Sequence, residues 1–130
     1  MSGGGPTLRS DRARVAHLGS ARSGTRHNAH MRLTSMALIP LTFAFVLMVL
    51  TLATRDYNGV RSYLGHPLPG ILMLLFVGAG IYHMQLGMRT IIEDYIHGHH
   101  AKDAALMANL FFCIGLGCAC VYALLRISFT

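Results

Sequence analysis

A single histidine, His83, lies near the middle of the apolar stretch GAGIYHMQLGMRT, which runs from Gly78 to Thr90. On a helix, its neighbours three and four residues away are Gly80 and Gly87, so residues without side chains flank the imidazole. This pattern predicts a flat recess with an imidazole projecting from it. A porphyrin laid against a helix needs such a surface, and neutral imidazole is a common axial ligand of haem iron.

Two other interpretations of His83 remain open at this point. The glycines could allow two helices to pack closely, with the imidazole hydrogen-bonded across the contact. An ionisable residue in an apolar segment could also belong to a proton relay. Spacing alone favours haem ligation and packing equally, and the relay less.

The same segment ends in RTIIEDYIHGHH, where Asp94 and Tyr95 stand next to each other. A phenol at membrane depth can donate a hydrogen bond to a lipophilic carbonyl compound such as a quinone. The simpler alternative is an interfacial belt, in which tyrosines anchor the helix and carboxylates face water. Spacing alone favours the belt.

The distribution of charge predicts the elements that carry these residues. Charged residues make up only 12% of the 130 residues, against about 25% in an ordinary soluble domain. No Asp, Glu, Lys or Arg occurs over 33–54, 62–88 or 104–125, and each stretch is longer than the roughly 20 residues that span a bilayer. None has the polar stripe that a helix of a soluble bundle needs. The sequence therefore predicts an all-α membrane protein with three transmembrane helices.

The expected organisation is a polar basic arm over residues 1–31, followed by a three-helix transmembrane domain over 32–128. Its helices are expected at about 33–54, 69–97 and 103–127, in an up-down-up bundle. TRDYNGVRSYLGHPLP, between the first two helices, is rich in turn-forming residues and is expected to be a loop. The short second connection makes the last two helices antiparallel neighbours.

The net charge of +6 comes mostly from the N-terminal arm. Six arginines precede the first expected helix: Arg9, Arg12, Arg14, Arg22, Arg26 and Arg32. A basic arm could bind nucleic acid, but a membrane segment follows at once, so the positive-inside rule is the simpler explanation and no nucleic-acid partner is expected. The N-terminus is therefore expected on the cytoplasmic side, or in the mitochondrial matrix if the chain is organellar.

A haem held by two histidines would need a second ligand besides His83. Neither of the other two expected helices contains a histidine. The nearest candidates along the same helix, from His97 onward, lie about 20 Å away along its axis. A second ligand is therefore expected from another chain.

Three groups of residues together resemble a known family, the small hydrophobic membrane anchors of succinate dehydrogenase, of the cytochrome b type. The first comprises GSARSGT and RLTSMALIPL, at residues 19–25 and 32–41. The second is His83 with Gly87 four residues later, and the third is the Asp94-Tyr95 pair. With the three-helix layout, the resemblance covers about residues 16–128.

The resemblance implies a role for each matched residue. His83 is expected to be an axial ligand of haem b, with the other ligand supplied by a companion membrane anchor, a second small chain of the same complex. Arg32 is expected near the haem propionates, where a guanidinium suits a carboxylate. Tyr95 is expected to hydrogen-bond a ubiquinone carbonyl, and Asp94 to help organise that site.

The function implied is that of a non-catalytic membrane anchor of succinate:ubiquinone oxidoreductase, respiratory complex II. Iron–sulfur and flavoprotein subunits would oxidise succinate, and this chain would sit in the bilayer of a bacterial inner membrane or the mitochondrial inner membrane. Two alternatives are a three-helix membrane interaction protein without a cofactor and the anchor of a related fumarate reductase.

Overall fold

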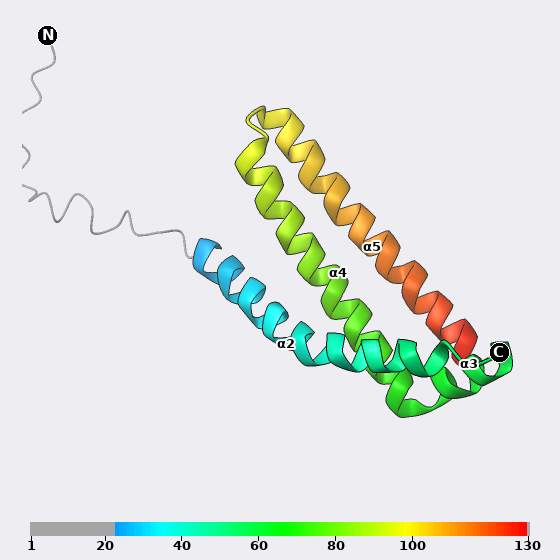
Figure 1. Ribbon diagram of the computed structural model, residues 1–130. Helices are drawn as coiled ribbons and strands as arrows, with labels where there is room; N and C mark the ends of the chain where they lie inside the picture. The colour runs from blue at the N-terminus through cyan, green and yellow to red at the C-terminus, as the bar shows by residue number, and fades with distance from the viewer. Residues whose placement is uncertain (1–22, 130) are drawn as a thin grey trace, which may run out of the picture.

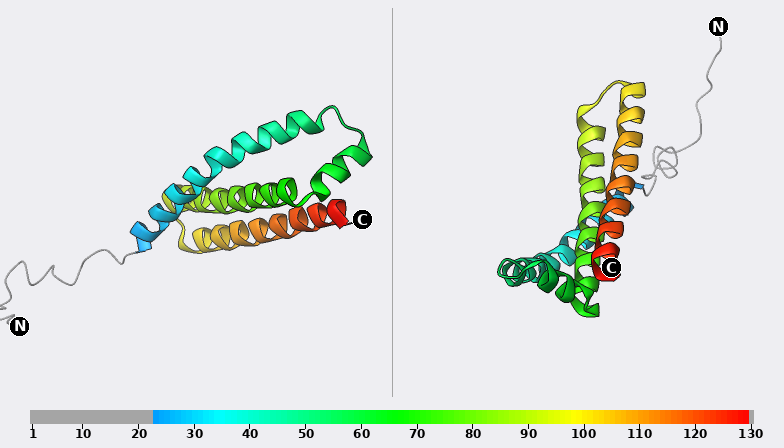
Figure 2. Two further views of the ribbon diagram at one scale, coloured as in Figure 1. Left: turned by 90° about the horizontal axis from the view of Figure 1, so that it is seen from below. Right: turned by 90° about the vertical axis from the view of Figure 1, so that its right-hand side faces the viewer.

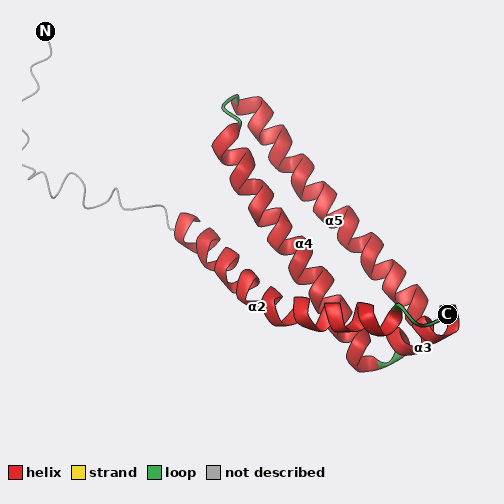
Figure 3. Cartoon of the chain, viewed as in Figure 1, coloured by secondary structure: helices red, strands yellow, loops and turns green. Residues whose placement is uncertain are grey.

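The computed structural model describes residues 23–129, which form four helices and, within that range, no strand (Figure 3). These helices are α2 (Ser23–Leu52), α3 (Tyr57–Gly65), α4 (Pro67–Tyr95) and α5 (His99–Phe129). Three of them, α2, α4 and α5, are long and apolar enough to cross a membrane. The predicted all-α fold with three candidate membrane spans is confirmed.

Helix α4 is the central element of the described chain. Figures 1 and 2 show α5 running beside it in the opposite direction, joined by a tight connection. Helix α2 crosses the other side of α4 at a more oblique angle (Figure 2). The long helices thus run up, down and up, as expected from the short second connection.

Helix α2 begins at Ser23, well before the start expected at Leu33, so the last part of the expected polar arm is helical. The segment lacks apolar periodicity, which is why the sequence did not predict a helix there. Polar contacts to α4 hold it instead: Nε2 of His27 lies 3.0 Å from Oγ1 of Thr90. Residues 1–22, including four of the six arginines, lie outside the described part of the chain.

Pro40 lies inside α2. Proline removes one backbone hydrogen bond and its ring crowds the preceding turn, which bends a helix. Figure 1 shows α2 changing direction in its middle. The bend allows the first half of α2 to follow α4, while the second half leads toward α3.

The connection between the first two spans is a short helix, α3, and not the loop expected from its turn-forming residues. Asp56 is its N-cap, and the carboxylate accepts a hydrogen bond of 3.1 Å from the Gly59 amide. Leu64 is buried on its inner face. The Asp, Asn and Gly read as turn signals here begin a helix, because Asp is also a strong N-cap residue.

The tight connection at the other end joins α4, which ends at Tyr95, to α5, which begins at His99. Both boundaries lie a few residues before those expected. Nζ of Lys102 donates a 2.8 Å hydrogen bond to the Glu93 carbonyl, satisfying one of the free carbonyls at the end of α4. At its start, α4 has Pro67 in the first turn, where the missing amide proton costs nothing.

Few side chains are buried in the described chain. The buried apolar residues are Met48, Leu64, Leu86, Ile92 and Cys113. The one buried polar residue among those described is Asn109, whose amide nitrogen donates a 3.0 Å hydrogen bond to the Gln85 carbonyl across the α4–α5 contact. The large apolar side chains are mostly exposed, which is typical of helices that face lipid or another membrane subunit.

Candidate functional site

His83 lies near the middle of α4 and points toward α2. Its Nδ1 atom is 2.9 Å from Oγ1 of Thr34, a residue of α2. The imidazole is half-buried by this contact. Among residues 23–129, no hydrogen bond engages the other ring nitrogen, Nε2.

The two glycines expected to flank a recess around His83 have different surroundings. A side chain at Gly80 would meet nothing within 4 Å, so the surface there is open. A side chain at Gly87 would meet the end of Met31, 3.9 Å away on α2. The open surface beside the histidine therefore lies toward Gly80, and α2 covers the Gly87 side.

This arrangement fits a haem ligand. An imidazole binds iron through one nitrogen, while its other nitrogen forms a hydrogen bond that fixes the ring. His83 has one nitrogen bonded to Thr34 and the other without a partner in the described chain, beside a helix surface that is bare at Gly80. Within residues 23–129, no three His, Cys, Asp or Glu side chains gather as a site for a separate metal ion.

The expectation that the first and third helices contain no histidine is wrong, because the longer α2 includes His27 and His30 and α5 begins with His99 and His100. Nδ1 of His30 lies 3.0 Å from the Tyr82 hydroxyl, and the two rings meet edge to face. Neither His27 nor His30 is placed to complete a haem site with His83. Thr34 and Met31 of α2 already contact α4 at this level, which leaves no room for a porphyrin between the helices.

Arg32 lies on α2 with an exposed side chain. It is two residues before Thr34, so on a helix it projects from a different face. No hydrogen bond or ion pair of Arg32 is formed within the described residues. Its guanidinium is therefore available to a group outside the chain.

Asp94 and Tyr95 are the last two residues of α4, and both are exposed, Tyr95 to 78%. They lie about 18 Å along the helix from His83. The neighbouring carboxylate, Glu93, pairs with Arg89 at 2.7 Å. Asp94 has no such partner among residues 23–129, so the acidic side chain next to the tyrosine is free.

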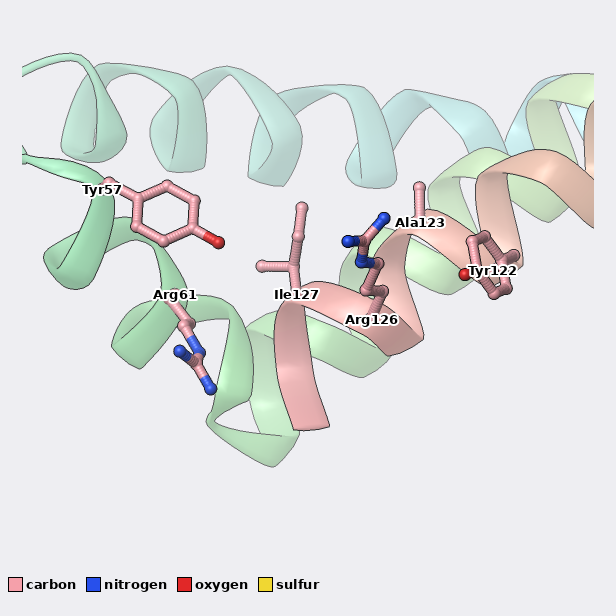
Figure 4. A pocket seen from close by; sticks show the side chains of 6 residues that line it. All are labelled: Tyr57, Arg61, Tyr122, Ala123, Arg126 and Ile127. Atoms are coloured by element: carbon pink, nitrogen blue, oxygen red, sulfur yellow. The ribbon is translucent and has the colours of Figure 1, made fainter. Parts of the chain in front are cut away.

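A cavity of about 370 Å³ lies at the opposite end of the molecule, between α3 and α5. Figure 4 shows two phenols and two guanidinium groups around it. Its lining residues are Tyr57, Arg61, Tyr122, Ala123, Arg126 and Ile127. None of the expected site residues belongs to it, and tyrosine and arginine are typical of a membrane–water interface.

The residues that join α2 to α4 were not predicted from the sequence. Thr34 contacts His83, and in a reciprocal arrangement His27 of α2 contacts Thr90 of α4. A signal was present: in each helix the threonine follows the histidine by seven residues, which is about two turns and places both on one face. Without the α2–α4 register, this spacing could not be connected to a contact.

Comparison with known proteins agrees with the resemblance found from the motifs. A family model described as "Succinate dehydrogenase/Fumarate reductase transmembrane subunit" matches residues 7–122. The succinate dehydrogenase hydrophobic membrane anchor subunit of Paracoccus denitrificans is 36% identical over 85% of this chain and 85% of its own length. The proteins of the same name from Rickettsia conorii and Rickettsia typhi are 34% and 30% identical, over 82% and 73% of this chain and 85% and 76% of their own lengths. No solved structure matches the chain. The chain belongs to the family of succinate dehydrogenase/fumarate reductase transmembrane subunits.

Proposed function

We propose that this chain is the hydrophobic membrane anchor of a succinate:ubiquinone oxidoreductase, in which it contributes one axial ligand of haem b and part of the ubiquinone site. The observation that carries the proposal is the state of His83. One ring nitrogen is held by Thr34, the other has no partner in residues 23–129, and the helix is bare beside it. Family membership supplies the enzyme complex in which such a ligand would act.

In this proposal the chain performs no chemistry on succinate. A flavoprotein subunit and an iron–sulfur subunit oxidise succinate and pass electrons to the membrane. A companion membrane anchor supplies the second haem ligand, because His27 and His30, the histidines of α2, are engaged with Thr90 and Tyr82 of α4. The exposed apolar surfaces of α2 and α5 give that partner and the lipid bilayer extensive areas to cover.

His83, Gly80 and Arg32 would each make a different contact with haem b. Nε2 of His83 would bind the iron, the bare surface at Gly80 would accommodate the porphyrin, and the exposed guanidinium of Arg32 would pair with a propionate. Gly87 would lie outside the porphyrin surface, because the end of Met31 on α2 lies over that position. The haem would supply a one-electron carrier within the membrane.

The quinone site would use the end of α4. The Tyr95 hydroxyl is exposed and can donate a hydrogen bond to a ubiquinone carbonyl. The free carboxylate of Asp94 can bind a basic residue of a partner chain and so hold that wall of the site in place.

In this proposal the chain lies in a bacterial cytoplasmic membrane, or in the mitochondrial inner membrane if it is organellar. The start of α2 and the α4–α5 connection lie at one end, which carries Arg26, Arg89 and Lys102. By the positive-inside rule, that end and the arginine-rich N-terminus face the cytoplasm.

Replacing His83 with alanine tests the haem assignment. The His83→Ala complex should lose the low-spin absorption and EPR spectrum of a haem with two axial nitrogen ligands, because one ligand is gone. Haem held by its remaining contacts should become high-spin. His27→Ala is the matched control, since it removes another imidazole from the α2–α4 contact and should leave the spectrum unchanged.

An unchanged low-spin spectrum in the His83→Ala complex would reject His83 as a ligand. It would favour a second candidate function, that of a cofactor-free interaction protein, which the hydrogen bond from His83 to Thr34 also supports. The family description also includes fumarate reductase. The redox potential of the quinone that the complex uses distinguishes an anchor of fumarate reductase from an anchor of succinate dehydrogenase.

A further inference from the structure

The hydroxyl group of Thr34 has one proton, and the structure indicates where it goes. Oγ1 lies 2.9 Å from the carbonyl oxygen of His30 and 3.0 Å from that of Met31, in the preceding turn of α2. Carbonyl oxygens only accept hydrogen bonds, so the threonine must be the donor in this interaction. Its oxygen can then only accept from the third neighbour, Nδ1 of His83, at 2.9 Å.

The direction of that bond determines the form of the imidazole. Nδ1 of His83 must carry a proton in order to donate it, and in a neutral imidazole the other nitrogen is then an unprotonated acceptor. Iron binds the neutral form of imidazole, so this is the form that matters for a haem ligand. Nε2 therefore holds a free lone pair, which is what a metal requires of a histidine.

The same bond also sets the direction of the ring. The two ring nitrogens point along widely diverging lines, so fixing Nδ1 on α2 turns Nε2 away from α2. The alternative tautomer would place a proton on Nε2 and leave two acceptors, Nδ1 and the threonine oxygen, facing each other. The contact thus disfavours the form of His83 that cannot bind iron through Nε2.

The second histidine–threonine pair provides an internal comparison. Oγ1 of Thr90 donates to the Leu86 carbonyl at 3.1 Å and so accepts from Nε2 of His27 at 3.0 Å. This pair joins the same two helices with the same chemistry, two turns away. It involves the opposite ring nitrogen and lies at the end of α4 near the polar residues, so it serves only to join the helices.

We propose that Thr34 is the positioning residue that fixes His83 as the Nδ1-protonated tautomer and directs its Nε2 lone pair away from α2 toward the haem. The proposal rests on the haem ligation by His83 proposed above and identifies the partner on which that ligation depends. Thr34 itself touches neither the iron nor the quinone.

The test compares three variants in the intact complex. Thr34→Val keeps the shape of the side chain but removes the hydroxyl, Thr34→Ser keeps the hydroxyl, and Thr90→Val makes the same change at the pair that serves only packing. A hydrogen bond from the ring nitrogen that does not bind the metal raises the basicity of a ligating imidazole. Losing the partner of that bond typically weakens metal binding about 10- to 100-fold. Thr34→Val should therefore release haem more readily, raise its midpoint potential, and broaden its low-spin EPR signal.

Thr34→Ser should restore the wild-type potential, and Thr90→Val should leave the haem signals unchanged. The inference is overturned if Thr34→Val keeps the wild-type potential and EPR spectrum. It is also overturned if Thr34→Val and Thr90→Val change them equally, because the effect would then come from looser helix packing.

A readout that does not need haem separates this inference from the proposed function. Nitrogen-15 NMR of the haem-free complex, labelled at histidine, reports which ring nitrogen of His83 carries the proton. The signals of His83 are those that disappear in the His83→Ala complex. Nδ1 protonation that disappears in Thr34→Val supports the role of Thr34. A complex that shows this behaviour but never binds haem refutes the haem proposal alone, and Nε2 protonation in the wild type refutes the role of Thr34.

Discussion

At the scale of single residues, two of the three interpretations of His83 that spacing left open, haem ligation and helix packing, are compatible. The two interpretations exclude each other only if the imidazole makes a single interaction, whereas the ring has two nitrogens. Nδ1 of His83 joins α4 to α2 through Thr34, while Nε2 has no partner within residues 23–129. Each nitrogen can therefore serve one of the two functions.

Tyr95 can be tested by removing only its hydroxyl. Tyr95→Phe keeps the ring in the interface but cannot donate a hydrogen bond to a quinone carbonyl. An unmade hydrogen bond costs about 1–3 kcal/mol, so ubiquinone reduction should fall roughly five- to a hundredfold. Steady-state reduction of ubiquinone by succinate measures this, beside succinate oxidation with an artificial acceptor, which should not change.

Tyr122→Phe is the matched control for Tyr95→Phe. Tyr122 is also exposed, but it lines the cavity at the opposite end of the molecule (Figure 4). Quinone reduction that stays normal in Tyr95→Phe would mean that Tyr95 is an interfacial anchor, as the spacing alone favoured. An equal fall in both variants would point to a general loss of membrane assembly.

At the scale of elements, α4 is joined to its two neighbours by polar contacts within an apolar setting. The histidine–threonine pairs join it to α2, and Asn109 joins it to α5 through the Gln85 carbonyl. The thiol of Cys113 donates in turn to Oδ1 of Asn109 at 3.6 Å. Such contacts stabilise helix pairs in lipid, where burial of apolar surface provides no driving force.

Asn109→Ala should weaken the α4–α5 pair. The variant loses the donor to Gln85 and leaves the Cys113 thiol without its acceptor, and interhelical hydrogen bonds in membranes are worth about 0.6–2 kcal/mol. Thermal unfolding of the complex in detergent should show a lower midpoint. Asn58→Ala, at an exposed asparagine of α3, is the control. Equal midpoints for the two variants would contradict the role assigned to Asn109.

The boundaries of the elements show which physical signals the sequence carried. Long charge-free runs predicted the three spans, because hydrocarbon excludes charge over a fixed thickness. The first turns of α2 were missed because side chains on another helix, such as Thr90, hold them in place. Helix α3 was missed because Asp56 belongs to a residue type that favours both turns and helix starts.

At the scale of the whole molecule, the up-down-up arrangement makes a definite prediction about sidedness. Cysteine introduced at His100, in the first turn of α5, should react with an impermeant reagent from the cytoplasmic side. Cysteine at Asn58, on α3, should react from the other side. Both positions are exposed, and Cys113, Cys118 and Cys120 would be replaced first. Labelling of both positions from one side would exclude this topology.

The candidate site was only partly predictable from the sequence. His83 and Gly80 could be found because a helical period determines which residues of one element are neighbours. Thr34 could not, because its contact with His83 depends on how α2 and α4 are aligned, and no local pattern encodes that register. The acceptor role of its hydroxyl required the positions of the His30 and Met31 carbonyls as well.

The scarcity of buried side chains has a consequence for how this chain can change during evolution. A position that faces lipid needs only to be apolar, so exchanges among leucine, isoleucine, valine, methionine and phenylalanine cost little there. Five buried apolar residues and a few polar contacts are all that the described chain must keep for its own packing. Lipid-facing positions of the chain are thus free to change among apolar residues, and relatives 30–36% identical along most of the chain are consistent with this freedom. In a more distant member of the family, we expect overall sequence identity to be lost before these polar contacts. A histidine and a threonine seven residues apart, present in two successive spans, would then identify such a member better than overall identity.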